Sequence, residues 1–183
     1  EIGMTNYPFK SLEDVEDIES INYAHEALEK GVPLEVIMDQ IRHIGRDNAR
    51  TPMQWNHEAE AGFTTGQPWL AINPNYKEIN VEAALADPDS IFYTYQALVA
   101  LRKEQPWLVT ADYELVDAVD KVFAYKRVER EQVYLVVVNL SSQEQDLPLV
   151  NGVEEVLIAN TKVEQVLESG KLAPWDAFCV KLA

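Results

Sequence analysis

The chain has 183 residues, of which 47% are hydrophobic, and its 31 Asp and Glu against 15 Lys and Arg give a formal net charge of -16. This composition fits a packed globular protein, with enough residues for one medium domain or for part of a domain beside a small complete one. The excess of carboxylates argues against nucleic-acid and anionic-membrane partners, because affinity for nucleic acid depends on Lys and Arg that neutralise phosphates.

The cysteine content and the apolar runs of the sequence indicate the cellular location of the protein. Cys179 is the single cysteine, so no disulfide can form within the chain, which favours a reducing, cytoplasmic location. The longest apolar run, 133–138, is far shorter than the ~20 residues that span a bilayer. The first four residues have neither a cationic start nor an apolar signal segment, and we expect a processed or truncated start.

The first hundred residues predict helices joined by long loops. Ser11 is the expected cap of a first helix that Gly31 ends. Its apolar residues recur at helical spacing, at Val15, Ile18, Ala24 and Leu28. Pro33 suits the first turn of a second helix, which Gly45 ends. The residues expected to point inward from it are Leu34, Ile37, Met38, Ile41 and Ile44.

A polar loop with several aromatic residues follows, from Arg46 to about Val81, and a third helix is expected between Asp87 and Pro106. Beyond residue 110 the pattern predicts short strands over 113–116, 122–128, 133–140, 154–159 and 177–182. Polar turns are expected at 117–121, 129–132 and 169–170, and the unalternating run 133–138 predicts a central strand covered on both faces. The sequence therefore predicts a helical part over 1–110 and a small antiparallel β domain over 111–183.

The densest group of candidate functional residues lies in the long loop. Residues 46–55 read Arg-Asp-Asn-Ala-Arg-Thr-Pro-Met-Gln-Trp, followed by Ala-Gly-Phe-Thr at 61–64. Guanidinium groups donate in-plane hydrogen bonds to adjacent hydroxyls and indole rings pack on the C–H faces of a pyranose, so the mixture suits a sugar. From residue types alone, an arginine paired with Asp47 that only holds the loop is the favoured interpretation.

The complete string resembles the α-amylase superfamily, glycoside hydrolase family 13, in the branch of oligo-1,6-glucosidase and dextran glucosidase (glucan 1,6-α-glucosidase). Supporting strings are 1–6, 17–22, 74–81 and 89–103. The resemblance implies an α/β plus all-β architecture. Residues 1–110 would be the C-terminal part of a TIM (β/α)8 barrel, from the end of strand 8 through the last barrel helix. Residues 111–183 would be a β-sandwich, domain C.

The resemblance also implies a reaction. The family hydrolyses α-glucosidic bonds with retention, which needs a nucleophilic carboxylate and a carboxylic acid about 5 Å away. In the family these groups, and a third carboxylate, follow barrel strands that would precede this chain. We therefore expect the chain to carry none of the catalytic residues, to hold neither a metal nor a cofactor, and to be inactive alone.

The resemblance implies three substrate-binding residues, at positions of this sequence that match binding positions of the family. Arg46 corresponds to the arginine that binds the non-reducing-end glucose in the −1 subsite, and Glu19 to a residue that lines the +1 subsite. Arg50 is expected to orient the loop. The three histidines have no spacing typical of metal ligands.

Alternatives stay open within and outside this class. Trehalose-6-phosphate hydrolase belongs to the same branch, and a non-catalytic carbohydrate-binding module built on the β domain is a different class. The substrate partner that the resemblance implies for the full-length protein is an α-linked gluco-oligosaccharide. One further partner is the missing N-terminal barrel portion: an incomplete barrel cannot bury its inner face, so we expect residues 1–110 to self-associate, exchange between copies or be poorly ordered.

Overall fold

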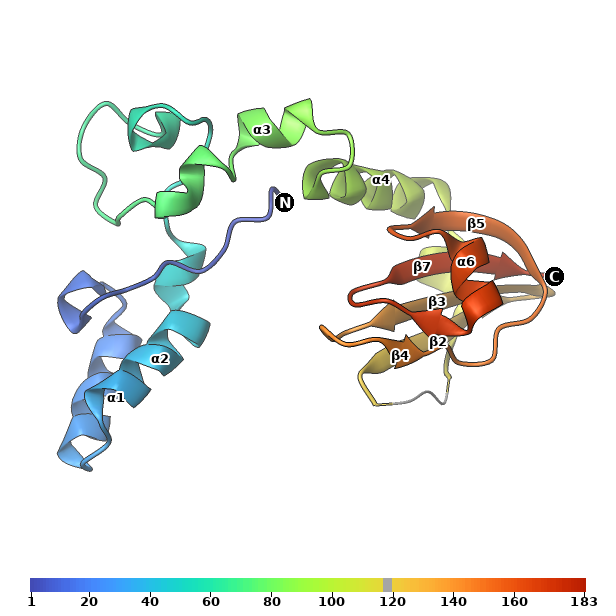
Figure 1. Ribbon diagram of the computed structural model, residues 1–183, viewed down its shortest axis with the longest axis horizontal. Helices are drawn as coiled ribbons and strands as arrows, with labels where there is room; N and C mark the ends of the chain where they lie inside the picture. The colour runs from blue at the N-terminus through green and yellow to red at the C-terminus, as the bar shows by residue number, and fades with distance from the viewer. Residues whose placement is uncertain (117–119) are drawn as a thin grey trace. The chain divides into compact units, whose positions relative to one another are not determined.

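The computed structural model describes residues 1–116 and 120–183, which divide into two compact units, 1–96 and 97–183 (Figure 1). The predicted order, a helical part followed by an antiparallel sheet, is confirmed. The helices of the first part are α1 (Ile18–Glu29), α2 (Leu34–Ile44), α3 (Val81–Ala86) and α4 (Ile91–Glu104), and the unit boundary falls within α4. In the described ranges, no helix has both the length and the apolar character to cross a membrane.

The start of α1 differs from the prediction. The helix begins at Ile18, because the Asp17 carboxylate accepts a hydrogen bond from the Ser20 amide at 3.0 Å and so caps it. Ser11 caps only the 3-10 turn η1 (Leu12–Asp14). Ile18 and Leu28 were expected in the apolar pattern and are 63% and 41% exposed, since they lie in the end turns of the helix.

The helix α2 begins at Leu34, one residue after Pro33, and Gly45 caps its end after Ile44, as predicted. Its middle residues pack into a core cluster whose other members come from 9–27: Phe9, Val15, Ala24, Ala27, Ile37, Met38 and Ile41. Leu34 and Ile44 are 48% and 82% exposed, so their predicted inward orientation is wrong. Both lie in the terminal turns of α2, outside this cluster.

The long loop holds the 3-10 turns η2 (Arg46–Ala49), η3 (Ala59–Gly62) and η4 (Pro74–Lys77). Asn73 fixes its far end, since its amide donates to the carbonyls of Thr5 and Asn6 at 3.0 and 3.1 Å. In η3, Glu60 and Ala61 have φ of 51° and 53° and Gly62 has 66°, three successive left-handed residues. The helix α3, which directly follows the loop, was not predicted.

The second unit is built on a five-stranded antiparallel sheet in the order β1-β2-β3-β7-β5. Its strands are β1 (Asp112–Leu115), β2 (Val122–Glu129), β3 (Gln132–Asn139), β5 (Val153–Ala159) and β7 (Ala177–Leu182). All five predicted strands are confirmed to within one residue at each end. The predicted turn 117–121 lies partly outside the described residues.

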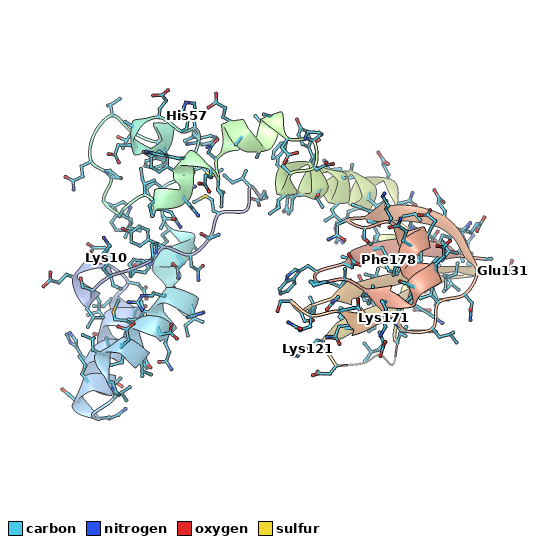
Figure 2. All side chains as sticks on the ribbon, in the orientation of Figure 1. Lys10, His57, Lys121, Glu131, Lys171 and Phe178 are labelled. Atoms are coloured by element: carbon cyan, nitrogen blue, oxygen red, sulfur yellow. The ribbon has the colours of Figure 1, made fainter. Side chains whose placement is uncertain are left out.

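A second, two-stranded sheet pairs β4 (Gln145–Asp146) with β6 (Lys171–Leu172), and the short helices α5 (Trp107–Thr110) and α6 (Val163–Ser169) complete the unit. One face of the large sheet packs on α6 and β6 through Phe178, Val163, Val166 and Leu172; Figure 2 shows Phe178 on β7 beside α6. On the other face, the Trp107 ring stacks on that of Tyr134, with centroids 3.7 Å apart. The central strand β3 is therefore covered on both faces, as predicted.

Candidate functional site

Arg46 and Glu19, separated by 27 positions in the sequence, meet in the structure. The guanidinium Nη1 of Arg46 lies 3.0 Å from Oε2 of Glu19, and their side chains are 57% and 70% exposed. Glu19 is in the first turn of α1, and Arg46 opens η2 directly after α2. The family resemblance singled out both residues for adjacent subsites, and the fold brings them together at the surface of the first unit.

Gly45 sets the direction in which Arg46 leaves α2. Its amide donates to the Ile41 carbonyl at 2.8 Å, and a Cβ at this position would lie 2.6 Å from that oxygen. Any larger residue would therefore have to displace either the last turn of α2 or the start of η2. The glycine keeps Arg46 close to the helix end and within reach of Glu19.

A groove of about 420 Å³ passes the pair. It is lined by Asp17, Glu19, Ser20, Tyr23, Gln40, Ile41, Ile44, Gly45 and Arg46. Tyr23 lies one turn after Glu19 on α1, and its hydroxyl donates to the Gln40 side chain. The groove thus combines a cation, carboxylates, a hydroxyl and an amide with the apolar side chain of Ile44, the mixture that binds sugar hydroxyls and C–H faces.

The electrostatics of the groove favour binding over proton transfer. The hydrogen bond with Glu19 and the charges of Glu19 and Asp17 raise the pKa of Arg46, which stays a cation. Burial favours the neutral form of Asp17, but hydrogen bonds from Ser20 and Arg50 outweigh it and lower its pKa. Asp17 is therefore ionised at neutral pH and unsuited to protonate a leaving group.

Arg50 lies behind the groove. Its Nη1 is 3.2 Å from Asp17 Oδ1 and 3.5 Å from Asp47 Oδ1. Asp47 is 1% exposed, and its Oδ2 accepts hydrogen bonds from the amides of Glu16 and Asp17, both at 2.8 Å. From the sequence, Asp47 was expected only as a partner for an arginine and Asp17 was not predicted; a carboxylate just before the first apolar turn of α1 was the available signal.

Neither His43 nor His57 lines this groove. His43 and His57 are exposed and lie near carboxylates: His43 is 3.6 Å from Asp39, and His57 is 3.1 Å from Glu82. Figure 2 labels His57 on the loop between α2 and α3. Across residues 1–116 and 120–183, no group of three or more His, Cys, Asp and Glu side chains is placed to hold a metal ion.

A wider hollow of about 960 Å³ lies along the long loop, lined among others by Glu13, Glu60, Trp69 and Tyr76. Trp69 is 72% exposed, and Trp55 and Phe63 are about half exposed. In the second unit Cys179 is buried, and burial raises the pKa of its thiol to about 11, so it is an inert core side chain.

Comparison with known proteins places these features in a family. The model of the α-amylase catalytic domain matches residues 1–111. The chain is 68% identical, over 182 residues, to the glucan 1,6-alpha-glucosidase of Streptococcus pneumoniae serotype 4, with all of this chain and 34% of that protein covered. It thus spans about a third of the length of that relative.

Solved structures also match this chain over its whole length. The whole chain matches 34% of the trehalose-6-phosphate hydrolase of Bacillus licheniformis with a TM-score of 0.85 and 37% identity. It also matches 34% of the trehalulose synthase of Pseudomonas mesoacidophila, with a TM-score of 0.87 and 38% identity. Variants of this synthase have been solved in complex with glucose and with its substrate sucrose.

Proposed function

This chain belongs to the α-amylase family, and we propose that it supplies one wall of the substrate pocket in a retaining, exo-acting α-glucosidase. The proposed reaction is hydrolysis of α-1,6-glucosidic bonds at the non-reducing end of isomalto-oligosaccharides or dextran. The 68% identity to a glucan 1,6-alpha-glucosidase supports the linkage. The observation that carries the proposal is the exposed Arg46–Glu19 pair in its groove.

Arg46 and Glu19 are assigned to neighbouring sugars. Arg46 binds hydroxyls of the terminal glucose in the −1 subsite, because its guanidinium can pair with Glu19 through Nη1 and still donate from its other nitrogens. Glu19 accepts from hydroxyls of the second sugar in the +1 subsite. Because Arg46 Nη1 and Glu19 Oε2 are 3.0 Å apart, the two side chains can contact sugars on the two sides of one glycosidic bond without moving. Arg50 acts on the substrate only through the groups it orients.

The chemical step is assigned to carboxylates outside these 183 residues. A retaining mechanism needs a free nucleophilic carboxylate and a protonated partner about 5 Å away. Within the groove Glu19 is paired with Arg46, and Asp17 with Arg50. We therefore expect the 183-residue chain to release no glucose from isomaltotriose under conditions in which the whole protein does. Turnover by the isolated chain would refute this assignment.

The substrate-binding roles are tested in the whole protein by Arg46→Lys and Glu19→Gln. Losing charge-assisted hydrogen bonds worth about 1.5–3 kcal/mol each should lower kcat/KM for isomaltotriose by about tenfold to a hundredfold. Glu26→Gln is the matched control, since Glu26 lies on the same helix and contacts only Lys30, at 3.8 Å, among the ion pairs of the described residues. Activity that is unchanged in both site variants would contradict the proposal.

Trehalose-6-phosphate hydrolase is the alternative within the class, supported by the structural match at 37% identity. A phosphate needs a cationic pocket, whereas the groove carries Asp17 and Glu19 beside Arg46. Comparing kcat/KM of the whole protein for isomaltotriose and for trehalose 6-phosphate separates the two. A preference for the phosphorylated disaccharide would overturn the leading assignment.

A carbohydrate-binding module is the alternative of another class, and one observation favours it. Tyr113 and Phe123 are 53% and 42% exposed, and their rings lie 5.2 and 5.4 Å from that of Tyr125. Such a row can act as a platform for successive sugar rings. Saturable binding of isomaltotriose by the 183-residue chain that Tyr113→Ala abolishes would support the module, and binding that Arg46→Lys abolishes would support the pocket.

We also propose that the protein is cytoplasmic and that its helical part associates with the remaining barrel. The single cysteine, which is free and buried, supports a cytoplasmic location. On α4, Ile91 and Tyr95 are 58% and 48% exposed, and this supports association of the helical part with the remaining barrel. We expect the isolated chain to self-associate in sedimentation experiments, and a monodisperse monomer with an ordered first unit would contradict this.

A further inference from the structure

We propose that Asp47, together with Asp17 and Arg50, is a positioning residue that fixes the spacing between Arg46 and Glu19 and thereby between the −1 and +1 sugars. We call these three side chains the carboxylate clamp. The proposal rests on the proposed function, and it adds a buried device that neither the family match nor the substrate-binding assignment contains.

The bonds of Asp47 join two separate segments. Its Oδ2 accepts from the Glu16 and Asp17 amides at 2.8 Å each, and these residues immediately precede α1. Its Oδ1 faces Arg50 at 3.5 Å. A carboxylate that is 1% exposed is tolerated only where it is paired and hydrogen-bonded. The donors are therefore required, and they tie the start of α1 to the loop after α2.

Asp17 continues the connection into α1. It is 4% exposed, and one of its oxygens accepts from the Ser20 amide and hydroxyl at 3.0 and 2.9 Å. The other oxygen faces Arg50 at 3.2 Å. The same carboxylate thus caps the helix that carries Glu19 and holds the arginine that pairs with Asp47.

The clamp lies next to both sugar-binding residues. Asp47 directly follows Arg46, and Asp17 precedes Glu19 by two positions in the first turn of α1. The direct Arg46–Glu19 contact cannot fix the geometry, because exposed ion pairs contribute between nothing and about 1 kcal/mol and exchange readily with water. The bonds that the two buried carboxylates of the clamp accept are the stronger restraint, and they fix the positions of Arg46 and Glu19.

The test is a double-mutant cycle in the whole protein. Asp47→Asn keeps the shape of the side chain and removes its charge, and misplacement of Arg46 and Glu19 should lower kcat/KM for isomaltotriose by about tenfold to a hundredfold. In a protein that already carries Arg46→Lys and Glu19→Gln, the same substitution should cost less than about threefold, because residues acting as one unit are not additive. Melting curves establish that each variant is folded.

Asp14→Asn is the matched control. One oxygen of Asp14 accepts two successive amides, of Lys10 and Ser11, at 3.0 Å each, which repeats the geometry of Asp47 at an exposed position outside the groove. We expect this variant to retain full activity. If Asp47→Asn does not fold, Arg50→Gln replaces it in the same double-mutant cycle. The Arg50 side chain is 39% exposed, so its substitution leaves a smaller buried defect.

The outcomes separate the two proposals. Equal losses from Asp47→Asn in both backgrounds would reduce the clamp to a structural role and overturn the inference while leaving the proposed function intact. Equal losses from Asp14→Asn and Asp47→Asn would overturn it as well. If Arg46→Lys and Glu19→Gln leave activity unchanged, the proposed function fails first, and the inference fails with it.

Discussion

Leu172→Ala should destabilise the second unit strongly. Leu172 lies on β6 with no exposed surface, and it packs in the core cluster with Val166 of α6 and Phe178 of β7. The substitution removes three carbon groups, which at about 0.8 kcal/mol each amounts to about 2.4 kcal/mol of transfer free energy. The cavity left behind raises the expected loss of unfolding free energy to about 3–4 kcal/mol.

Urea unfolding of the chain measures this loss, followed by tryptophan fluorescence, in which Trp107 of the second unit is the buried tryptophan and the other three are exposed. Leu149→Ala is the matched control, because the same atoms are removed from a side chain that is 87% exposed, and its effect should stay within about 0.5 kcal/mol. A loss below about 1 kcal/mol for Leu172→Ala would refute the assignment of α6, β6 and β7 to one core.

Three further predictions concern single residues. Burial favours the neutral form of the Asp17 carboxyl, but hydrogen bonds from Ser20 and Arg50 outweigh it and hold the pKa below its ordinary value of 3.8, so the ionised form contributes stability above that pH. The stability difference between wild type and Asp17→Asn should therefore be constant from pH 7 to 5 and shrink below pH 4 in urea titrations; a constant difference down to pH 3 would be contrary. Cys179, with a pKa of about 11, should resist a thiol reagent at pH 8 until urea unfolds the chain, and rapid native labelling would contradict its burial. Gly45→Ala should lower the melting temperature, since its Cβ would lie 2.6 Å from the Ile41 carbonyl, whereas Gly66→Ala, with 3.8 Å to its nearest neighbour, should not.

Strand positions were predictable because each strand is a short β-branched or aromatic run between polar turns. The run 133–138 showed no alternation, and β3 indeed contributes to clusters on both faces of the sheet. The helix α6 was missed although Val163 and Val166 have helical spacing and Gly170 follows with φ of 67°. Seven residues between two strands are too few for periodicity to distinguish a helix from a loop.

Helix ends were less predictable, because a cap depends on a geometry that the sequence does not show. Ser11 and Asp17 both have side chains that can cap, and only the structure shows that the Asp17 carboxylate reaches the Ser20 amide. For the candidate site, family resemblance singled out Arg46 and Glu19 separately. Their contact at 3.0 Å, and the carboxylate clamp behind it, depend on how α1 and α2 pack, which no local pattern contains.

Every bond of the carboxylate clamp begins and ends between Glu16 and Arg50. That stretch also contains both residues proposed to bind sugar and the groove that they line. Residues 16–50 could therefore be exchanged as one block between related proteins, and both partners of each of these bonds would come from the same parent. A junction between Glu19 and Arg46 would instead combine Asp17 from one parent with Asp47 and Arg50 from the other. For the recombination of substrate preferences, the ends of this segment are the natural crossover points.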